Sequence, residues 1–183
     1  MSATGKKVVA AGVRTATAIQ AAWELPYGPL TAAQARGALS SWLAGFGIDP
    51  ADGPGFDIVL ATSEVAANAS VHGRPPVLLD AWLERGENGQ VVAVCVSDAD
   101  PELPGPASPS LLAEYGRGLG IVAALALRLD IRQTTDGKEI WFEIAVPSQA
   151  SVVGNGRASY HNDPFGMNNE LNPGPTCGEA LAS

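Results

Sequence analysis

The chain has 183 residues, 46% of them hydrophobic, and a formal net charge of −8. This length suits one domain of ~100–150 residues with tails, and the negative charge argues against nucleic-acid binding and against docking on an anionic membrane surface. No apolar run approaches the ~18 residues of a membrane span. Two cysteines, Cys95 in an apolar run and Cys177 near the C-terminus, do not make a disulfide framework, so we expect a protein of the reducing cytoplasm.

The first half of the chain predicts a strand followed by two helices. The segment 18–29, AIQAAWELPYGP, is typical of a short strand that ends in a Pro/Gly turn. Apolar residues then recur at three- and four-residue steps over 31–46, which predicts a helix that Thr31 can cap. The segment 56–72 predicts a second helix of similar character, closed by a glycine.

The second half predicts mostly strands. Two apolar runs over 77–98 are separated by GENG, which indicates an antiparallel hairpin with Cys95 as a buried strand residue. A Pro-rich loop over 99–110 leads to a Gly-rich segment that becomes helical from about Leu119. The segment 131–147 then predicts strand, TDGK turn and strand.

This order of elements predicts the fold class and the domain organisation. Strand, helix, helix, two strands, loop, helix and two strands indicate an α+β fold, a two-layer sandwich with helices on one face of a mostly antiparallel sheet. The domain spans 19–147, after a loose leader over 1–18. Gly, Asn, Pro and Ser dominate 148–183, which predicts a flexible tail.

The stretch SEVAANASVHG places Glu64, Asn68 and His72 at four-residue steps along one edge of an otherwise apolar helix. A helix this apolar should be largely buried, so its polar edge should line a cavity or find internal partners. A carboxylate can orient an attacking hydroxyl, and an amide oxygen is a hard ligand suited to Mg²⁺. The alternative is a chance spacing on a solvent-facing helix, and for His72 we favour a helix-end residue that meets the helix dipole.

Two further features carry chemistry. Asp98 ends the second hairpin strand, where its carboxylate can accept a hydrogen bond from an amino group, although an ordinary turn aspartate is the alternative. YGRGLG, over 115–120, opens directly into an apolar helix, so its glycines allow close backbone approach and its free N–H groups can meet an anion. The pattern is neither a P-loop nor a Rossmann turn, and a flexible hinge is the alternative.

Taken in order, LATSEVAANASVHG, VCVSDADPELP and EYGRGLGIVAAL resemble the N, G1 and G2 boxes of GHKL (histidine-kinase-like) ATP-binding domains. The resemblance is greatest to the small anti-sigma-factor serine kinases of actinobacteria (RsbW and SpoIIAB type), and it covers roughly residues 20–147. It implies the Bergerat ATP-binding fold, with ATP and Mg²⁺ as ligands.

The resemblance also implies a role for each matching residue. Glu64 would polarise the attacking hydroxyl, Asn68 would coordinate the Mg²⁺ that bridges the phosphates, and Asp98 would bind the adenine amino group. The lid over the phosphates would consist of Gly116, Arg117, Gly118, Leu119 and Gly120.

The sequence departs from the family pattern at two places. Many relatives have glycines after the G1 aspartate, whereas Ala99, Asp100 and Pro101 follow it here. Larger relatives often carry a threonine beside the adenine on the late strand, where this chain has Lys138 and Glu139. No dimerisation helix with a phospho-acceptor histidine precedes the domain, so a complete sensor histidine kinase is not expected.

Three functions remain open at this stage. The leading hypothesis is an ATP-dependent protein serine/threonine kinase that phosphorylates a small anti-sigma antagonist and also binds a sigma factor. Such a kinase does not bind nucleic acid directly. The second is a non-catalytic ATP-binding module that regulates a transcription-related partner, and the third is a scaffold that has lost ATP. Relatives commonly dimerise, which implies a possible homodimer.

Overall fold

The computed structural model describes residues 19–86, 89–103 and 116–148. The leader, most of the tail, Cys177 and residues 104–115 lie outside these ranges. In chain order the elements are β1 (Ile19–Leu25), α1 (Thr31–Ala44), α2 (Gly53–His72), β2 (Val77–Gly86), β3 (Gly89–Asp98), α4 (Gly116–Leu125), β4 (Arg128–Gln133) and β5 (Lys138–Pro147).

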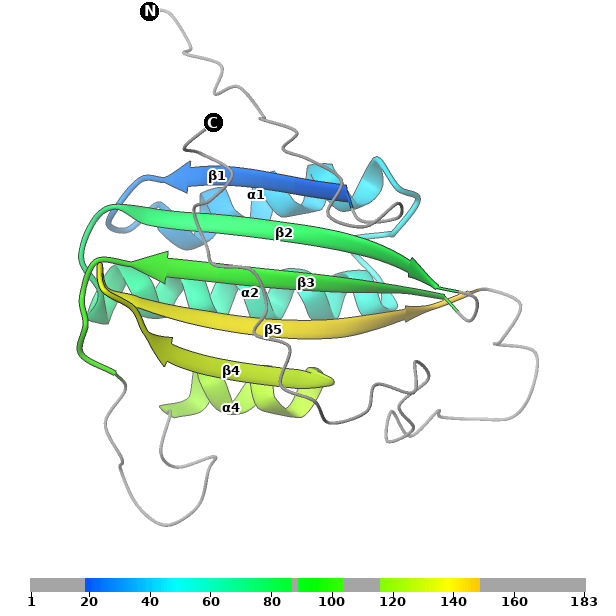
Figure 1. Ribbon diagram of the computed structural model, residues 1–183. Coiled ribbons are helices and arrows are strands. Elements are labelled where there is room, and N and C mark those ends of the chain that lie inside the picture. Colours follow the sequence, from blue (N-terminus) through cyan, green and yellow to red (C-terminus); the bar gives the residue numbers. More distant parts are fainter. Residues whose placement is uncertain (1–18, 87–88, 104–115, 149–183) are drawn as a thin grey trace, which may run out of the picture.

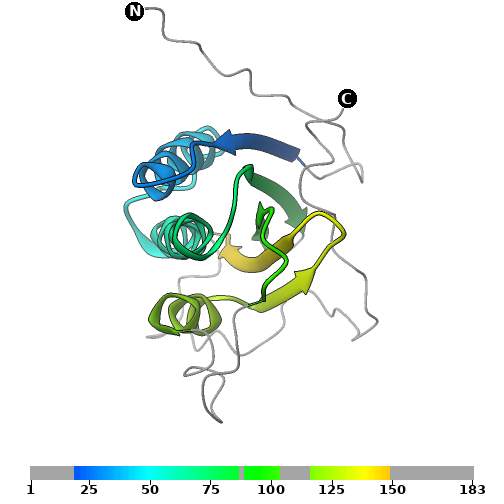
Figure 2. The same cartoon turned by 90° about the vertical axis from the view of Figure 1, so that its left-hand side faces the viewer.

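The strands form one sheet of five in the order β1-β2-β3-β5-β4, and every neighbouring pair is antiparallel. Figure 1 shows the sheet face-on, and Figure 2 shows α1, α2 and α4 side by side on one face of it, with α2 in the middle. The predicted α+β, two-layer architecture is confirmed.

Side chains that alternate along the strands explain why the two layers form. On β3, Val92, Val94 and Val96 point into the main core beneath the helices, while Ala93 and Cys95 point to the opposite face. Cys95 is fully buried there, as a strand residue was predicted to be. The main core also takes Leu79, Leu83, Ile140, Phe142 and Ile144 from the sheet and Leu39, Leu43, Ile58, Val65, Leu119 and Val122 from the helices.

The helix starts differ from those expected. Thr31 does not cap α1: Leu30 is the cap residue, and the buried Thr31 hydroxyl donates to the carbonyl oxygen of Gly28 at 2.7 Å, which fastens the preceding turn. Helix α2 begins at Gly53 because the Asp52 side chain accepts a hydrogen bond from the Gly53 N–H and a proline follows. Helix α4 begins at Gly116, so the glycine-rich segment is itself helical.

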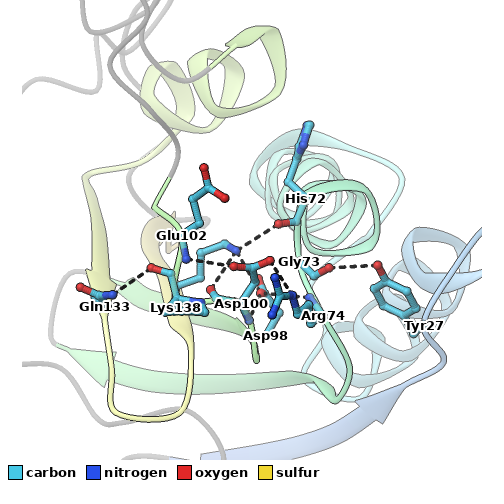
Figure 3. Close-up of polar contacts among 10 residues, drawn as sticks. Tyr27, His72, Gly73, Arg74, Asp98, Asp100, Glu102, Gln133 and Lys138 are labelled. Carbon is cyan, nitrogen blue, oxygen red and sulfur yellow. Dashed lines mark hydrogen bonds and ion pairs between the residues drawn. The ribbon is translucent and has the colours of Figure 1, made fainter.

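Three chain segments meet at one end of the sheet. Helix α2 ends there at His72, β3 ends at Asp98, and β5 begins at Lys138 (Figures 1 and 3). Antiparallel pairing places Asp98 directly opposite Lys138 on the neighbouring strand. Because cross-strand partners point to the same side of a sheet, the register alone brings these two side chains together.

Candidate functional site

Glu64 and Asn68 lie one turn apart on α2, and both are half-buried. Helix α4 packs beside α2, and a Cβ atom placed on Gly118 would lie 2.7 Å from the Glu64 Oε2 atom. The structure therefore brings the glutamate of the first motif against the glycine-rich segment of the third. Only a residue without a side chain at position 118 allows this close approach without moving the carboxylate.

The glycine-rich segment forms the first turns of α4. Arg117 is exposed, whereas Leu119 is 1% exposed and belongs to the main core. The Leu119 side chain thus anchors the helix to the sheet, and only its backbone is available for a ligand. Gly116 and Gly120 lie in the same turns of the helix.

His72 is the last residue of α2, and its ring is exposed and points away from the polar cluster in Figure 3. Its backbone carbonyl oxygen, however, accepts a hydrogen bond from Lys138 Nζ at 3.3 Å. These positions agree with the interpretation of His72 as a helix-end residue.

Asp98 is buried, and its Oδ1 atom accepts hydrogen bonds from the backbone N–H groups of Arg74 (3.3 Å) and Asp100 (2.9 Å). The same atom forms an ion pair with Lys138 Nζ at 3.0 Å (Figure 3). The carboxylate predicted to bind an adenine amino group therefore already has internal donors.

Lys138 is the residue whose role at this site sequence reasoning missed. Its side chain is 4% exposed, and Nζ donates to the Asp98 carboxylate and to the carbonyl oxygens of Asp100 (3.1 Å) and His72 (3.3 Å). One ammonium group thereby joins β5, the end of α2 and the loop after β3. The signal that could have found it was the register of β5 against β3, two strands that are neighbours in the sheet but are separated in the chain by α4 and β4.

Two glycines make room for this cluster. Gly137 has φ +154°, and a Cβ atom there would collide with the backbone carbonyl oxygen of Asp98. At Gly73, a Cβ atom would lie 2.7 Å from the Asp98 Oδ1 atom. Both positions therefore require glycine for the chain to close around the Asp98 side chain.

The loop after β3 carries a second, more open ion pair. Arg74 Nε lies 3.1 Å from Asp100 Oδ2, and the Arg74 side chain is 70% exposed. The pKa of Asp100 is lowered, mainly because its carboxylate accepts a hydrogen bond from the Glu102 backbone N–H, with the positive charges of Arg74 and Lys138 adding to the effect. The loop is thus held in place by backbone hydrogen bonds as well as charge.

The donor chemistry of the site fits a magnesium nucleotide. Among the residues that the structure describes, no three His, Cys, Asp or Glu side chains group as a metal site. Mg²⁺ is usually bound by one or two protein oxygens together with substrate phosphates, so it does not require such a cluster, and the half-buried Asn68 carries an amide oxygen of the suitable kind. Within the same described ranges, no helix is long and apolar enough to cross a membrane.

Comparisons with known proteins identify the fold of the chain. The crystal structure of the RsbU and RsbW domains of Rv1364c from Mycobacterium tuberculosis resembles the chain with a TM-score of 0.52 and 23% identity, over 70% of this chain and 33% of that one. The chain therefore spans about a third of that protein, and the likeness shows a shared fold. No curated protein matches the chain significantly.

The profile of the histidine kinase-like ATPase domain matches residues 25–144, a stretch that contains all the motifs described above. Each of the five strands and three helices of the described chain lies wholly or partly within this stretch. The resemblance found in the three sequence motifs is thereby confirmed: the chain belongs to the histidine kinase-like ATPase domain family.

Proposed function

We propose that this ATP-binding domain is a protein serine/threonine kinase that transfers the γ-phosphoryl group of ATP to a small anti-sigma antagonist. The observation that carries the proposal is the contact between Glu64 on α2 and Gly118 on α4, because it places a carboxylate beside a helix N-terminus suited to phosphates. The fold shared with a structure containing an RsbW domain supports this choice of partner class.

In this proposal the nucleotide lies along α2. Glu64 and His72 are eight residues apart on the helix, which corresponds to about 12 Å at 1.5 Å per residue. An extended nucleotide can therefore reach from the Asp98 end, where the base lies, to the Glu64 end, where the phosphates lie. The backbone N–H groups of Gly116, Arg117 and the residues that follow meet the phosphates at the start of α4.

Glu64 acts as the residue that accepts the proton of the attacking hydroxyl. A partner serine or threonine oxygen bonds to the γ-phosphorus, ADP leaves, and Glu64 takes the hydroxyl proton. Asn68 would hold Mg²⁺, which neutralises phosphate charge when it is bound. Positioning and charge neutralisation provide most of the catalysis in phosphoryl transfer, and these residues supply both.

The partner proteins are small anti-sigma antagonists, a sigma factor or both, and a second copy of the chain is a further partner. These assignments follow from the family branch that the three motifs resemble. A non-catalytic ATP-binding module is the alternative, and the variant of Glu64 described next separates the two.

The test incubates the full chain with labelled ATP, Mg²⁺ and purified antagonist proteins encoded near its gene. We expect label on a serine or threonine of one antagonist, and Glu64→Ala should abolish transfer while ATP binding persists. Glu84→Ala, which removes an exposed carboxylate from β2, is the matched control and should transfer normally. ATP binding without transfer to any antagonist would contradict the kinase assignment and favour the binding module.

A further inference from the structure

The ion pair between Asp98 and Lys138 is unusual for its burial. The two side chains are 3% and 4% exposed, whereas Arg74 in the neighbouring ion pair is 70% exposed. A charge this deeply buried is stable only when it is paired and hydrogen-bonded. The pair is therefore a fixed part of the folded site, unlike a surface ion pair that solvent can replace.

The hydrogen-bonding capacity of the ammonium group is fully used. A lysine ammonium has three N–H donors, and Lys138 Nζ meets three acceptors: the Asp98 carboxylate and the carbonyl oxygens of Asp100 and His72. Lys138 consequently has no N–H to offer a bound base. Its effect on a nucleotide must act through Asp98.

One oxygen of the Asp98 carboxylate is occupied, because Oδ1 already receives the ammonium and two backbone N–H groups. A ligand therefore meets the Oδ2 atom of a carboxylate whose charge is already paired. A hydrogen bond to an ionised acceptor is roughly twice as strong as a bond between neutral groups. The neutral amino group of adenine gains less of this strength from Asp98, because the Lys138 ammonium at 3.0 Å already compensates the carboxylate charge.

We propose that Lys138 is a specificity-determining residue of the nucleotide site: by holding Asp98 in an internal ion pair, it weakens recognition of the adenine amino group. The chain then binds purine nucleoside triphosphates mainly through their sugar and phosphates, with little discrimination at position 6 of the base. This inference rests on the proposed nucleotide site and adds the residue that sets its selectivity.

The test compares ATP with inosine triphosphate, which carries a carbonyl in place of the amino group. Calorimetry on the full chain with Mg²⁺ should give affinities for the two nucleotides within about fivefold of each other. In Lys138→Met the freed carboxylate accepts the adenine amino group, and the preference for ATP should rise by about tenfold or more. Arg74→Met, which removes a nearby positive charge without freeing Asp98, is the matched control and should behave as the unaltered chain.

The outcomes separate this inference from the proposed function. A preference for ATP above about fivefold in the unaltered chain would overturn the inference, and this measurement requires no variant to fold. An unchanged or smaller preference in a folded Lys138→Met protein, or in Lys138→Thr if the first variant does not fold, would also overturn it. If neither nucleotide binds to the unaltered chain, the proposed function itself fails, and the inference fails with it.

Discussion

Around Asp98, backbone N–H groups, carbonyl oxygens and the Lys138 ammonium group bond to one another, whereas Glu64 and Asn68 are half-buried and make no side-chain hydrogen bond with the described part of the chain. The polar groups around Asp98 and Lys138, the dense region, thus find their partners within the chain. The side chains of Glu64 and Asn68, the open region, have no such partner in the described part of the chain. The difference separates residues that hold the site together from residues that remain free to meet a ligand.

The largest expected effect on stability comes from removing the positive charge of Lys138 in the dense region. Lys138→Met leaves the buried Asp98 carboxylate without its counter-ion, so the free energy of unfolding should fall by about 3–5 kcal/mol. Arg74→Met breaks the exposed ion pair of the same loop and should lower it by about 1 kcal/mol or less. Urea denaturation of both variants measures the contrast, and equal losses would show that burial does not distinguish the two pairs.

A smaller loss is expected from Gly137→Ala, which tests the backbone that positions Lys138. The added Cβ atom meets the Asp98 carbonyl oxygen, and φ of +154° is strained for any residue other than glycine, so we expect a loss of about 2–3 kcal/mol. Gly37→Ala is the matched control, since nothing lies near its added Cβ on the exposed face of α1, and it should stabilise the fold slightly. Thermal unfolding of both proteins would refute the steric argument if their midpoints shift alike.

The open region should respond in activity more than in stability. In Gly118→Ala the new Cβ atom lies 2.7 Å from the flexible end of Glu64, which can move aside, so we expect unfolding free energy to change by about 1 kcal/mol or less. Displacing this carboxylate should lower phosphoryl transfer by about tenfold or more, with ATP affinity little changed. Steady-state kinetics with Gly37→Ala as control measures this, and normal transfer would mean that Glu64 need not occupy its observed position.

The smallest effect concerns a carboxylate outside both regions. Burial raises the pKa of Glu143 on β5 above its ordinary value of 4.5, so the folded state binds a proton more readily than the unfolded chain. The free energy of unfolding therefore falls as the pH rises from the ordinary pKa to the raised pKa of Glu143, and the loss is complete above the raised pKa. Glu143→Gln should raise the melting temperature by about 2 °C at pH 7 and give no gain below about pH 4. A gain in melting temperature that persists at low pH would show that the effect comes from packing and not from the charge of Glu143.

The sequence predicted the fold well because its signals are local. Alternation along β3 and β5 and the apolar faces of α1 and α2 determine the layers, and Glu64, Asn68 and Asp98 lie on the elements expected for them. Local signals were less reliable at helix starts. Thr31 was expected to cap α1, but its hydroxyl bonds to the preceding turn. Asp52 caps α2, which begins at Gly53, three residues before the expected start.

The candidate site was only partly predictable for a different reason. Glu64, Asn68 and Asp98 were found from residue type and motif order, and their roles in binding and catalysis remain predictions. Lys138 was noted only as a departure from a family pattern. Its ion pair with Asp98 joins residues 40 positions apart, and no local pattern specifies such a contact before the strand register is known.

That separation has a consequence for how this domain can vary. Because β3 and β5 are neighbours, Asp98 and Lys138 lie directly opposite each other, although α4 and β4 come between them in the chain. Helix α4 packs in the main core and β4 pairs with β5, so the part of this span that can vary is the connection from β3 to α4. Lengthening a connection raises the entropic cost of closing it by only about 0.6 kcal/mol per doubling of its length. An insertion between β3 and α4, or a partner-binding segment grafted there, should therefore leave the pairing of β3, β4 and β5 undisturbed.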